Sequence, residues 1–547
     1  MPRWKQTLKW QLRFHAYFWP MFLLLYVVYY GIGQIELEHD FPTPTDWGFW
    51  ARWEGRGGKC VLDRIAERGW AREGEWGRAW EYFGIDGLLG RLEDFKREGK
   101  GLRIQEVKSG DGMLMVDGVG KLGFDISSKS DRWKQGYWEC LMGLAKIAEH
   151  LDGCVKKREK KLTEKTKIYK NENIPSPENP RPVPMPWAAD GSHLQVPMLS
   201  EVEPALEDPQ HFYLRILTSH GFTNRQRLDA ALAFADWCDF KGLNETAGNM
   251  YDWALDIAAG GLPHNASEAV GHVVDIKTGI IQPGAEKHVT SNLLKATTAL
   301  GIYHARHGEI KEALPIFLSV LRARKALPPA PSGEKMRASN AANKNLMTAE
   351  ERANQTSTDV FTRTFRHFLS FFSETDNTRT YSNGDEVPHH TLAEACEEVG
   401  IMTYIGEILF ASTANASERE KGLSWTRDSV DAAEAILWFM DESGESRTSE
   451  GRTKCRQCLE TGLQNWKTMT KQMSRQATRS AQEAHDSKGW LGLGIGQGSA
   501  IQKAEQEVKR WNDEEVQIEL RRQKTASLVQ NLAPDMNAWG MISTIGS

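Results

Sequence analysis

The fold is decided by two stretches of equal length, FADWCDFKGLNETAGNMY at residues 234–251 and LGIYHARHGEIKEALPIF at residues 300–317. In both stretches the second residue is small. Counted from the first residue of each stretch, a glycine follows eight residues later, an alanine thirteen residues later and an aromatic residue seventeen residues later. The glycine suits a turn between two helical runs. The alanine lets two helices approach closely, and the aromatic residue one turn later fills the space between them. The pattern predicts two helical hairpins.

This spacing is typical of the tetratricopeptide repeat (TPR). One window alone would also fit an ordinary helical hairpin, whereas two with the same internal spacing favour a repeat. A third, looser window begins at Ile405-Gly406, with an insertion expected over Ala411–Ser424 before Ala435-x3-Phe439. A fourth pair is expected from Thr453. The first two windows lie farther apart than the ~34 residues of the standard repeat, and residues 273–281 between them predict a β-hairpin.

The apolar run at residues 14–35 contains no Asp, Glu, Lys or Arg, and its centre reads MFLLLYVVYY. At 1.5 Å per residue the run would make a helix of about 33 Å, enough to cross a bilayer core. We therefore expect a transmembrane helix that includes Trp19, Leu24 and Val28. The alternative, a cleaved signal peptide, calls for a shorter apolar run and a small-residue cleavage site, whereas Gln34-Ile-Glu-Leu-Glu follows here.

The charges that flank this run predict its orientation. Basic residues lie within 3–13 and acidic residues within 36–40, which favours an N-terminus on the matrix or cytoplasmic side. No acidic residue precedes Glu36, and the basic residues alternate with apolar ones, as in a mitochondrial targeting segment. The favoured location is the mitochondrial inner membrane, with the C-terminal domain in the intermembrane space. A signal anchor of the endoplasmic reticulum is the alternative.

Composition divides the chain further. A Trp-rich stretch is expected to hold strands around 107–124, a helix over 131–157 and a basic solvated helix end over 156–170. Polar insertions are expected at 328–358 and 374–390. A long helix over 499–532 would cover the open end of the repeats. The expected domains are a basic tail at 1–13, the transmembrane helix at 14–35, a Trp-rich soluble region at 36–170, a Pro-rich linker at 171–204, a TPR-like repeat domain at 205–470, and capping helices with a tail at 471–547.

The predicted fold class is therefore mainly α: a single N-terminal transmembrane helix followed by a TPR-like α-solenoid with irregular insertions. The formal net charge of −5 argues against a general nucleic-acid binder. Seven cysteines in 547 residues are too few for a disulfide framework, although a single bridge remains open.

Little in the sequence points to catalysis. Cys455-x-x-Cys458 is the one cysteine pair at metal spacing, and a zinc site would need two more ligands nearby. Its helical context favours two buried cysteines over a metal or redox role. The glycines of 492–498 lack the preceding strand of a nucleotide-binding loop. The motifs G-x-x-x-x-G-K-[ST], H-E-x-x-H and G-x-S-x-G do not occur. We expect no enzyme and no cofactor.

Several segments resemble a known family. They are 228–237, 250–257, the helix expected over 292–305, and Leu423-Ser-Trp-Thr-Arg-Asp428. They are similar to fungal mitochondrial inner-membrane TPR proteins, the group that includes the substrate adaptor subunit of the i-AAA protease, the AAA protease that faces the intermembrane space. The resemblance covers the apolar run and about residues 205–470. It implies docking to AAA protease subunits, binding of unfolded or membrane-anchored client proteins, and no catalytic residues.

The expected function is that of a membrane-anchored protein-binding adaptor or scaffold in mitochondrial protein quality control. The concave face of a TPR is lined by its first helices, so the expected protein-binding groove includes Asp236, Trp237, Ile302 and His304. An assembly factor or structural subunit of an inner-membrane complex is the alternative on the same fold. An enzyme built on the Trp-rich region is the third candidate.

Overall fold

A computed structural model gives the structure of the chain. It describes residues 3–69, 72–104, 123–158, 160–163, 165–184, 196–262, 273–329, 382–413, 415–442, 450–486 and 497–529. The fold over these residues is mainly helical, with helices packed in pairs, which confirms the coarse fold class. The chain splits into two compact units, Met1–Ala254 with Met347–Asn383, and Leu255–Leu346 with Gly384–Ser547.

The first unit is built around α5 (Asp131–His150), most of whose apolar side chains are buried. Ser130 caps its first turn, and Gly153, with φ +71°, follows its end. The helix therefore ends before the expected 157. Around it pack α2 (Phe49–Arg68), α3 (Glu73–Phe83), α4 (Leu88–Glu93), α6 (Pro209–Thr218) and α7 (Asn224–Phe240).

Short strands complete the first unit. β1 (Arg103–Ile104) pairs antiparallel with β2 (Phe124–Asp125), and most of the strand region expected around 107–124 lies outside the described residues. A second sheet, in the order β4-β3-β5, joins β3 (Cys154–Lys157), β4 (Ile168–Lys170) and β5 (Val202–Pro204). The basic run expected as a helix end is thus part of a sheet.

This sheet also changes the interpretation of the Pro-rich stretch. Ile174 and Val202 are buried with Val155 and Tyr169 in a small apolar cluster. The ends of the stretch are therefore packed rather than extended as a free linker, while residues 185–195 lie outside the described part of the chain. Short 3-10 turns lie within the stretch, near its two ends, at Asn171–Asn173 and Leu199–Glu201.

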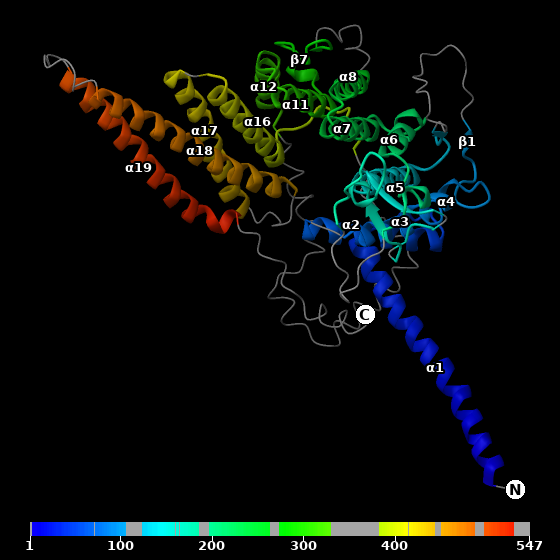
Figure 1. The fold of residues 1–547 in the computed structure, drawn as a ribbon. Coiled ribbons are helices and arrows are strands. Elements are labelled where there is room, and N and C mark those ends of the chain that lie inside the picture. Colours follow the sequence, from blue (N-terminus) through cyan, green and yellow to red (C-terminus); the bar gives the residue numbers. More distant parts are fainter. Residues whose placement is uncertain are drawn as a thin grey trace. The chain divides into compact units, whose positions relative to one another are not determined.

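The second unit consists mainly of long helices in antiparallel pairs (Figure 1). The division between the units falls inside α8 (Asn244–Gly260), which leads to the hairpin of β6 (Val274–Asp275) and β7 (Ile280–Ile281), as expected for 273–281. A 3-10 turn, Glu286–His288, follows. The pairs are α11 (Ser291–Arg306) with α12 (Ile310–Lys325), α16 (Leu392–Ala411) with α17 (Ala416–Glu442), and α18 (Glu450–Asp486) with α19 (Gln497–Val529).

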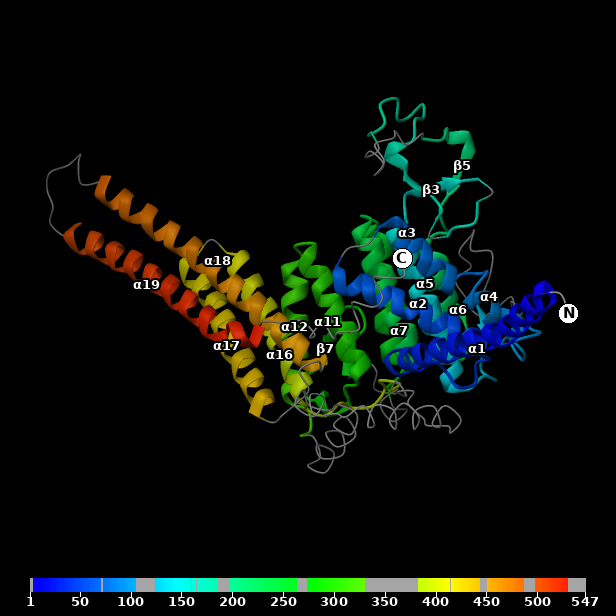
Figure 2. The same ribbon diagram turned by 90° about the horizontal axis from the view of Figure 1, so that it is seen from below.

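The three pairs of the second unit stack in sequence. α12 packs on α16, α17 packs on α18, and α16 also packs on α18. Figure 2 shows α18 and α19 lying side by side along their length. One apolar core runs through α16, α17, α18 and α19, and includes Leu423, Leu437, Leu459 and Trp466. The pair expected from Thr453 and the long helix expected over 499–532 are both present.

The third window needs a correction. Residues expected as an insertion belong to α17, where Gly422 crosses Gly406 of α16 at close range. The expected packing residues Ala435 and Phe439 are exposed, Phe439 by 50%. Ala433 and Leu437 point into the core in their place. A shift of two residues turns a helix by about 200°, so this window was assigned to the wrong face.

Helix α1 (Arg3–Asp40) contains the apolar run expected to cross a membrane. No helix in the described part of the chain is both long and apolar enough to span a bilayer, so the expected transmembrane helix is not found there. The side chains at 27–30, 32, 35 and 36, in and beside this run, lie outside the described ones, and Val28 is among them. Trp19 is 58% and Leu24 is 64% exposed.

Candidate protein-binding face

The first hairpin, α7 with α8, has the geometry that its spacing predicts. Ala235 and Ala247 are completely buried, and Tyr251 is buried one turn after Ala247. Gly242 has a φ of +75°, a left-handed conformation that ends α7 at little cost only for glycine. Thr223 precedes α7 and forms a capping box with Gln226. The Thr223 hydroxyl accepts a hydrogen bond from the Gln226 backbone amide, and the Gln226 side-chain oxygen accepts one from the Thr223 backbone amide.

The second hairpin, α11 with α12, repeats this geometry. Gly308 has a φ of +75°, and Ala313 and Phe317 are completely buried. A Cβ atom added at Gly301 would lie 3.1 Å from the Phe317 ring. The glycine in the second position thus makes room for the aromatic ring of the partner helix. The sequence therefore predicted both the turn and the packing of these two hairpins.

The four expected groove residues have different environments. Asp236 accepts a hydrogen bond of 2.7 Å from the Tyr251 hydroxyl, and the half-buried Trp237 stacks on Phe234 of its own helix. His304 contacts the Glu309 carboxylate, with 2.5 Å between Nδ1 and Oε2. Asp236 and Trp237 belong to the first unit, while Ile302 and His304 belong to the second. The four-residue groove therefore stays a prediction.

A more extended polar and aromatic surface lies on the first helices of the second unit. We call it the α16–α18 face. Glu397, Tyr404 and Glu407 follow one stripe of α16, and Lys454, Cys458 and Asn465 follow one stripe of α18. The stripes are joined by an ion pair of 2.6 Å between Lys454 Nζ and Glu397 Oε1, and by a hydrogen bond that the Asn465 amide donates to Glu407.

Tyr404 lies in the middle of the α16–α18 face. Its ring stacks on buried Phe317 of α12, with 5.6 Å between the ring centroids, while 38% of the residue stays exposed. Burial raises the pKa of Tyr404, and Cys458 and Glu407 raise that pKa further, whereas Arg306 lowers it. The phenol therefore stays neutral at physiological pH, with a fixed ring and an accessible hydroxyl. Such a side chain suits a contact with a partner protein.

The pKa values of the two carboxylates of this face are shifted in opposite directions. Burial alone would raise the pKa of Glu397, but Lys454, with Arg324 and Lys295 beyond it, brings that pKa below its usual value. Burial raises the pKa of Glu407, against the hydrogen bond from Asn465. Glu397 is therefore a firmly ionised group at one end of the face. Among the residues that the structure describes, no cation offsets the desolvation of Glu407 at the other end.

Helix α11 contributes to the same surface. Lys295 and Arg306 are close enough to α16 to act on the pKa values of Glu397 and Tyr404. Ile302 is seven residues after Lys295 and four before Arg306, so all three share one stripe of α11. Of the residues expected to line a groove, Ile302 thus lies beside the α16–α18 face, and His304 points to another side of its helix.

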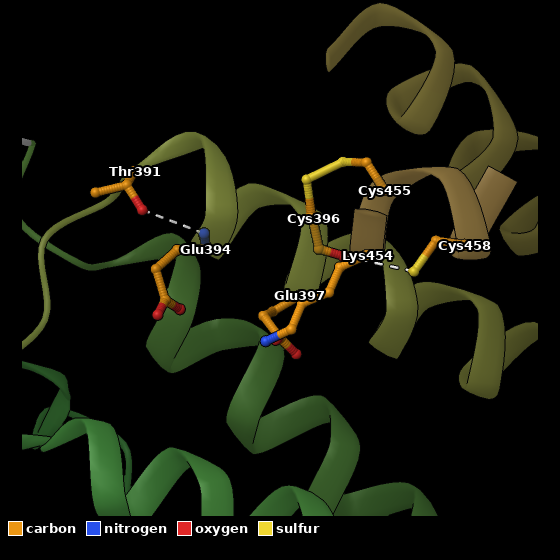
Figure 3. The surroundings of a disulfide bond; sticks show 7 residues. All are labelled: Thr391, Glu394, Cys396, Glu397, Lys454, Cys455 and Cys458. Carbon is orange, nitrogen blue, oxygen red and sulfur yellow. Dashed lines mark hydrogen bonds and ion pairs between the residues drawn. A yellow bond between two sulfur atoms is a disulfide. The ribbon is translucent and has the colours of Figure 1, made fainter. Parts of the chain in front are cut away.

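A disulfide bond lies behind this face and joins Cys396 of α16 to Cys455 of α18, with 5.0 Å between their Cα atoms (Figure 3). Cys455 is a buried helix cysteine, as expected, and it forms the single bridge that the sequence left open, with a partner 59 residues earlier. Cys458 remains a thiol, 3.8 Å from the Cys396 carbonyl oxygen. Burial, followed by the charge of Glu397, raises the pKa of Cys458 to about 11, with Lys454 acting against it.

A hollow of about 630 Å³ lies among α17, α18 and α19. Glu514 is fixed in its wall, because Arg427 donates to both carboxylate oxygens and the Trp466 indole donates to one of them at 2.7 Å. Lys509, Arg510, Asp431 and Asp513 also line it. This mixture of both charges and amides suits a polar polypeptide segment better than an apolar ligand.

Among the described residues, no group of three or more His, Cys, Asp or Glu side chains could hold a metal ion. The Gly-rich loop at 492–498 lies mostly outside the described residues. Comparisons with known protein families, with curated proteins and with solved structures found no match.

Proposed function

We propose that this protein is a membrane-anchored adaptor or scaffold that binds other proteins through a TPR-like stack of helical hairpins. The supporting observation is the packing order of the second unit. Each second helix, α12 and then α17, packs on the first helix of the next pair. This arrangement leaves α11, α16 and α18 to line one surface, as the first helices do in a solenoid.

The chemistry of the α16–α18 face fits a polypeptide partner. It combines the partly exposed Tyr404 ring, the ionised pair of Glu397 and Lys454, and the amide of Asn465. Aromatic and charged groups held in fixed positions are the usual centres of protein interfaces. The helices are longer than those of a standard repeat, which enlarges the available surface.

The proposed anchor is α1. From Phe14 to Tyr26 its large apolar side chains are between 37% and 78% exposed, on every side of the helix. Such a surface is costly in water and stable in lipid. We propose that this helix is held in the mitochondrial inner membrane, with the N-terminus in the matrix and both helical units in the intermembrane space. The partners are AAA protease subunits and their unfolded or membrane-anchored clients.

The test is co-purification of the full-length, C-terminally tagged protein from isolated mitochondria. We expect AAA protease subunits to co-purify with the wild type. Tyr404→Ala and Glu407→Ala should reduce their recovery about 5- to 30-fold, the effect of losing 1–2 kcal/mol at an interface centre. Phe439→Ala is the matched control, because Phe439 is an exposed aromatic residue on the second helix α17. Circular dichroism verifies that each variant is folded.

The outcomes separate the candidate functions. A stable stoichiometric complex on native gels without the protease would favour an assembly factor or structural subunit. Equal recovery with all three variants would contradict binding through the α16–α18 face. In the same mitochondria, the tag should become sensitive to added protease only after rupture of the outer membrane. Absence of the tag from mitochondria would contradict the proposed location.

A further inference from the structure

Three aromatic side chains cluster on the first turns of α2. Phe49 and Trp50 are 55% and 60% exposed, and Trp53 is partly buried. The ring centroids are 5.3 Å apart for Phe49 and Trp50, and 6.4 Å apart for Trp50 and Trp53. We call this group the aromatic cluster. It forms a compact apolar patch at the surface.

The aromatic cluster lies on the outer side of α2. The buried face of this helix is made by Ala51, Gly55 and Gly58, at helical spacing. Gly55 and Gly58 allow the Trp47 and Phe83 rings to pack directly against the backbone. Phe49 and Trp53, four residues apart, follow a different stripe. The inward packing of α2 is therefore complete without them.

A buried ion-pair network fixes α2 to the end of α1. Glu38, in the last turn of α1, pairs with Arg52 at 3.1 Å and with Arg56, which is 2% exposed. Both the backbone amide and the hydroxyl of Thr43 donate to Glu38, at 3.0 Å or less. Lys59 donates to the Pro42 carbonyl oxygen at 2.9 Å. Side chains of both helices therefore hold the turn between them, and α2 lies against the end of α1 (Figure 1).

We infer that the aromatic cluster rests in the headgroup layer of the bilayer that holds α1. The inference depends on the proposed membrane anchor. From the end of the apolar run at residue 35, α1 continues to Asp40, which adds about 7 Å at 1.5 Å per residue. That length matches a headgroup layer, roughly 5–8 Å thick on each side of the hydrocarbon core. The cluster follows one turn later, at the depth that Trp side chains prefer.

Lipid is favoured over a protein partner because the proposed anchor brings the bilayer to α1, and α2 is held against the end of α1. Glu38 in the last turn of α1 pairs with Arg52, which is the neighbour of Trp53 in the chain. The proposed bilayer around α1 therefore reaches the cluster without any additional partner. Burial of two large aromatic side chains in the headgroup layer would strengthen the hold of the first unit on the membrane. The cluster would hold the first unit against the membrane surface.

The test uses site-specific photocrosslinking in the full-length protein. The photoreactive residue p-benzoylphenylalanine replaces Trp50 in one variant, Leu24 of α1 in a second and Phe240 in a third. Phe240 is the matched control, since this aromatic residue in α7 of the same unit is 86% exposed. Each variant is reconstituted in phosphatidylcholine vesicles that contain a radiolabelled phospholipid. The label transferred to protein is measured after irradiation.

We expect labelled lipid on the variants at positions 24 and 50, at least tenfold above the variant at position 240. Label at position 24 with only background label at position 50 would contradict the placement of the aromatic cluster in the headgroup layer. That result would still support the proposed anchor. Equal label at positions 50 and 240 would also contradict that placement, because it would show that lipid is captured non-specifically by any exposed position. No label at position 24 would contradict the proposed anchor, and the inference would fall with it.

Discussion

At the residue scale, the environment of a side chain decides its chemistry more than its type does. Cys455 and Cys458 stand one turn apart on α18, yet Cys455 is oxidised and Cys458 is a thiol. Only Cys455 faces Cys396 across the packed helices. Cys458 lies on the stripe of α18 that forms the α16–α18 face, where a Cβ atom added at Gly400 of α16 would lie 3.4 Å from its sulfur. Position around the helix separates the two cysteines.

The raised pKa predicts a slow reaction of Cys458 with alkylating reagents. With a pKa of about 11, the thiolate fraction at pH 7.5 is roughly 300-fold lower than for an ordinary thiol of pKa ~8.5. Alkylation should accelerate about tenfold for each pH unit until the pH approaches 11. Mass spectrometry of the peptide that contains Cys458, after treatment with iodoacetamide, measures the rate. The urea-unfolded chain is the control. If Cys458 were alkylated at pH 7.5 as fast in the folded protein as in the unfolded chain, its thiol would not be buried.

At the element scale, glycine determines how closely α16 and α17 approach. A Cβ atom added at Gly422 would lie 2.6 Å from the Phe410 backbone nitrogen. Neither backbone can move without disturbing the core between the two helices. This pair of helices therefore depends on a residue without a side chain at the crossing point, a need that helix propensity alone would not indicate.

We expect Gly422→Ala to lower the free energy of unfolding by about 1–3 kcal/mol, the usual cost of overpacking a core. Gly260→Ala is the matched control, since a Cβ atom added there has no neighbour within 4 Å. Urea denaturation of the full chain, followed by far-UV circular dichroism, measures both. A stable Gly422→Ala variant would mean that α16 and α17 do not cross at this point.

At the scale of the whole molecule, the Cys396–Cys455 bond joins two helices through cysteines that are 59 residues apart in sequence. It constrains the unfolded chain more than the folded one. For a loop of this length the chain-entropy treatment gives about 4 kcal/mol of stabilisation.

Reduction should therefore lower the urea midpoint of the second unit. The Cys396→Ala/Cys455→Ala variant should show the lower midpoint with and without reductant. Cys238→Ala, which removes a buried thiol of the first unit, should leave the response to reductant unchanged. An identical midpoint for wild-type protein in both conditions would show that the bond does not form.

The sequence alone determined the features that depend on neighbours along the chain. The hairpins at 234–251 and 300–317 follow from local spacing, because a glycine turn and a buried alanine act within one pair of helices. The hairpin of β6 and β7 and the long helix α19 are local in the same sense. Their outcome agrees with the prediction.

Only the tertiary structure decided features that join distant segments. The face of α17 was misassigned because the shift from Ala435 to Ala433 depends on where α16 and α18 lie. The α16–α18 face combines stripes that are about 60 residues apart, and the partner of Cys455 is equally distant. The stripe from Glu397 to Glu407 is visible in the sequence, but its pairing with Lys454 and Asn465 is not. Helical spacing indicates which residues share a face, whereas packing against other helices decides what that face meets.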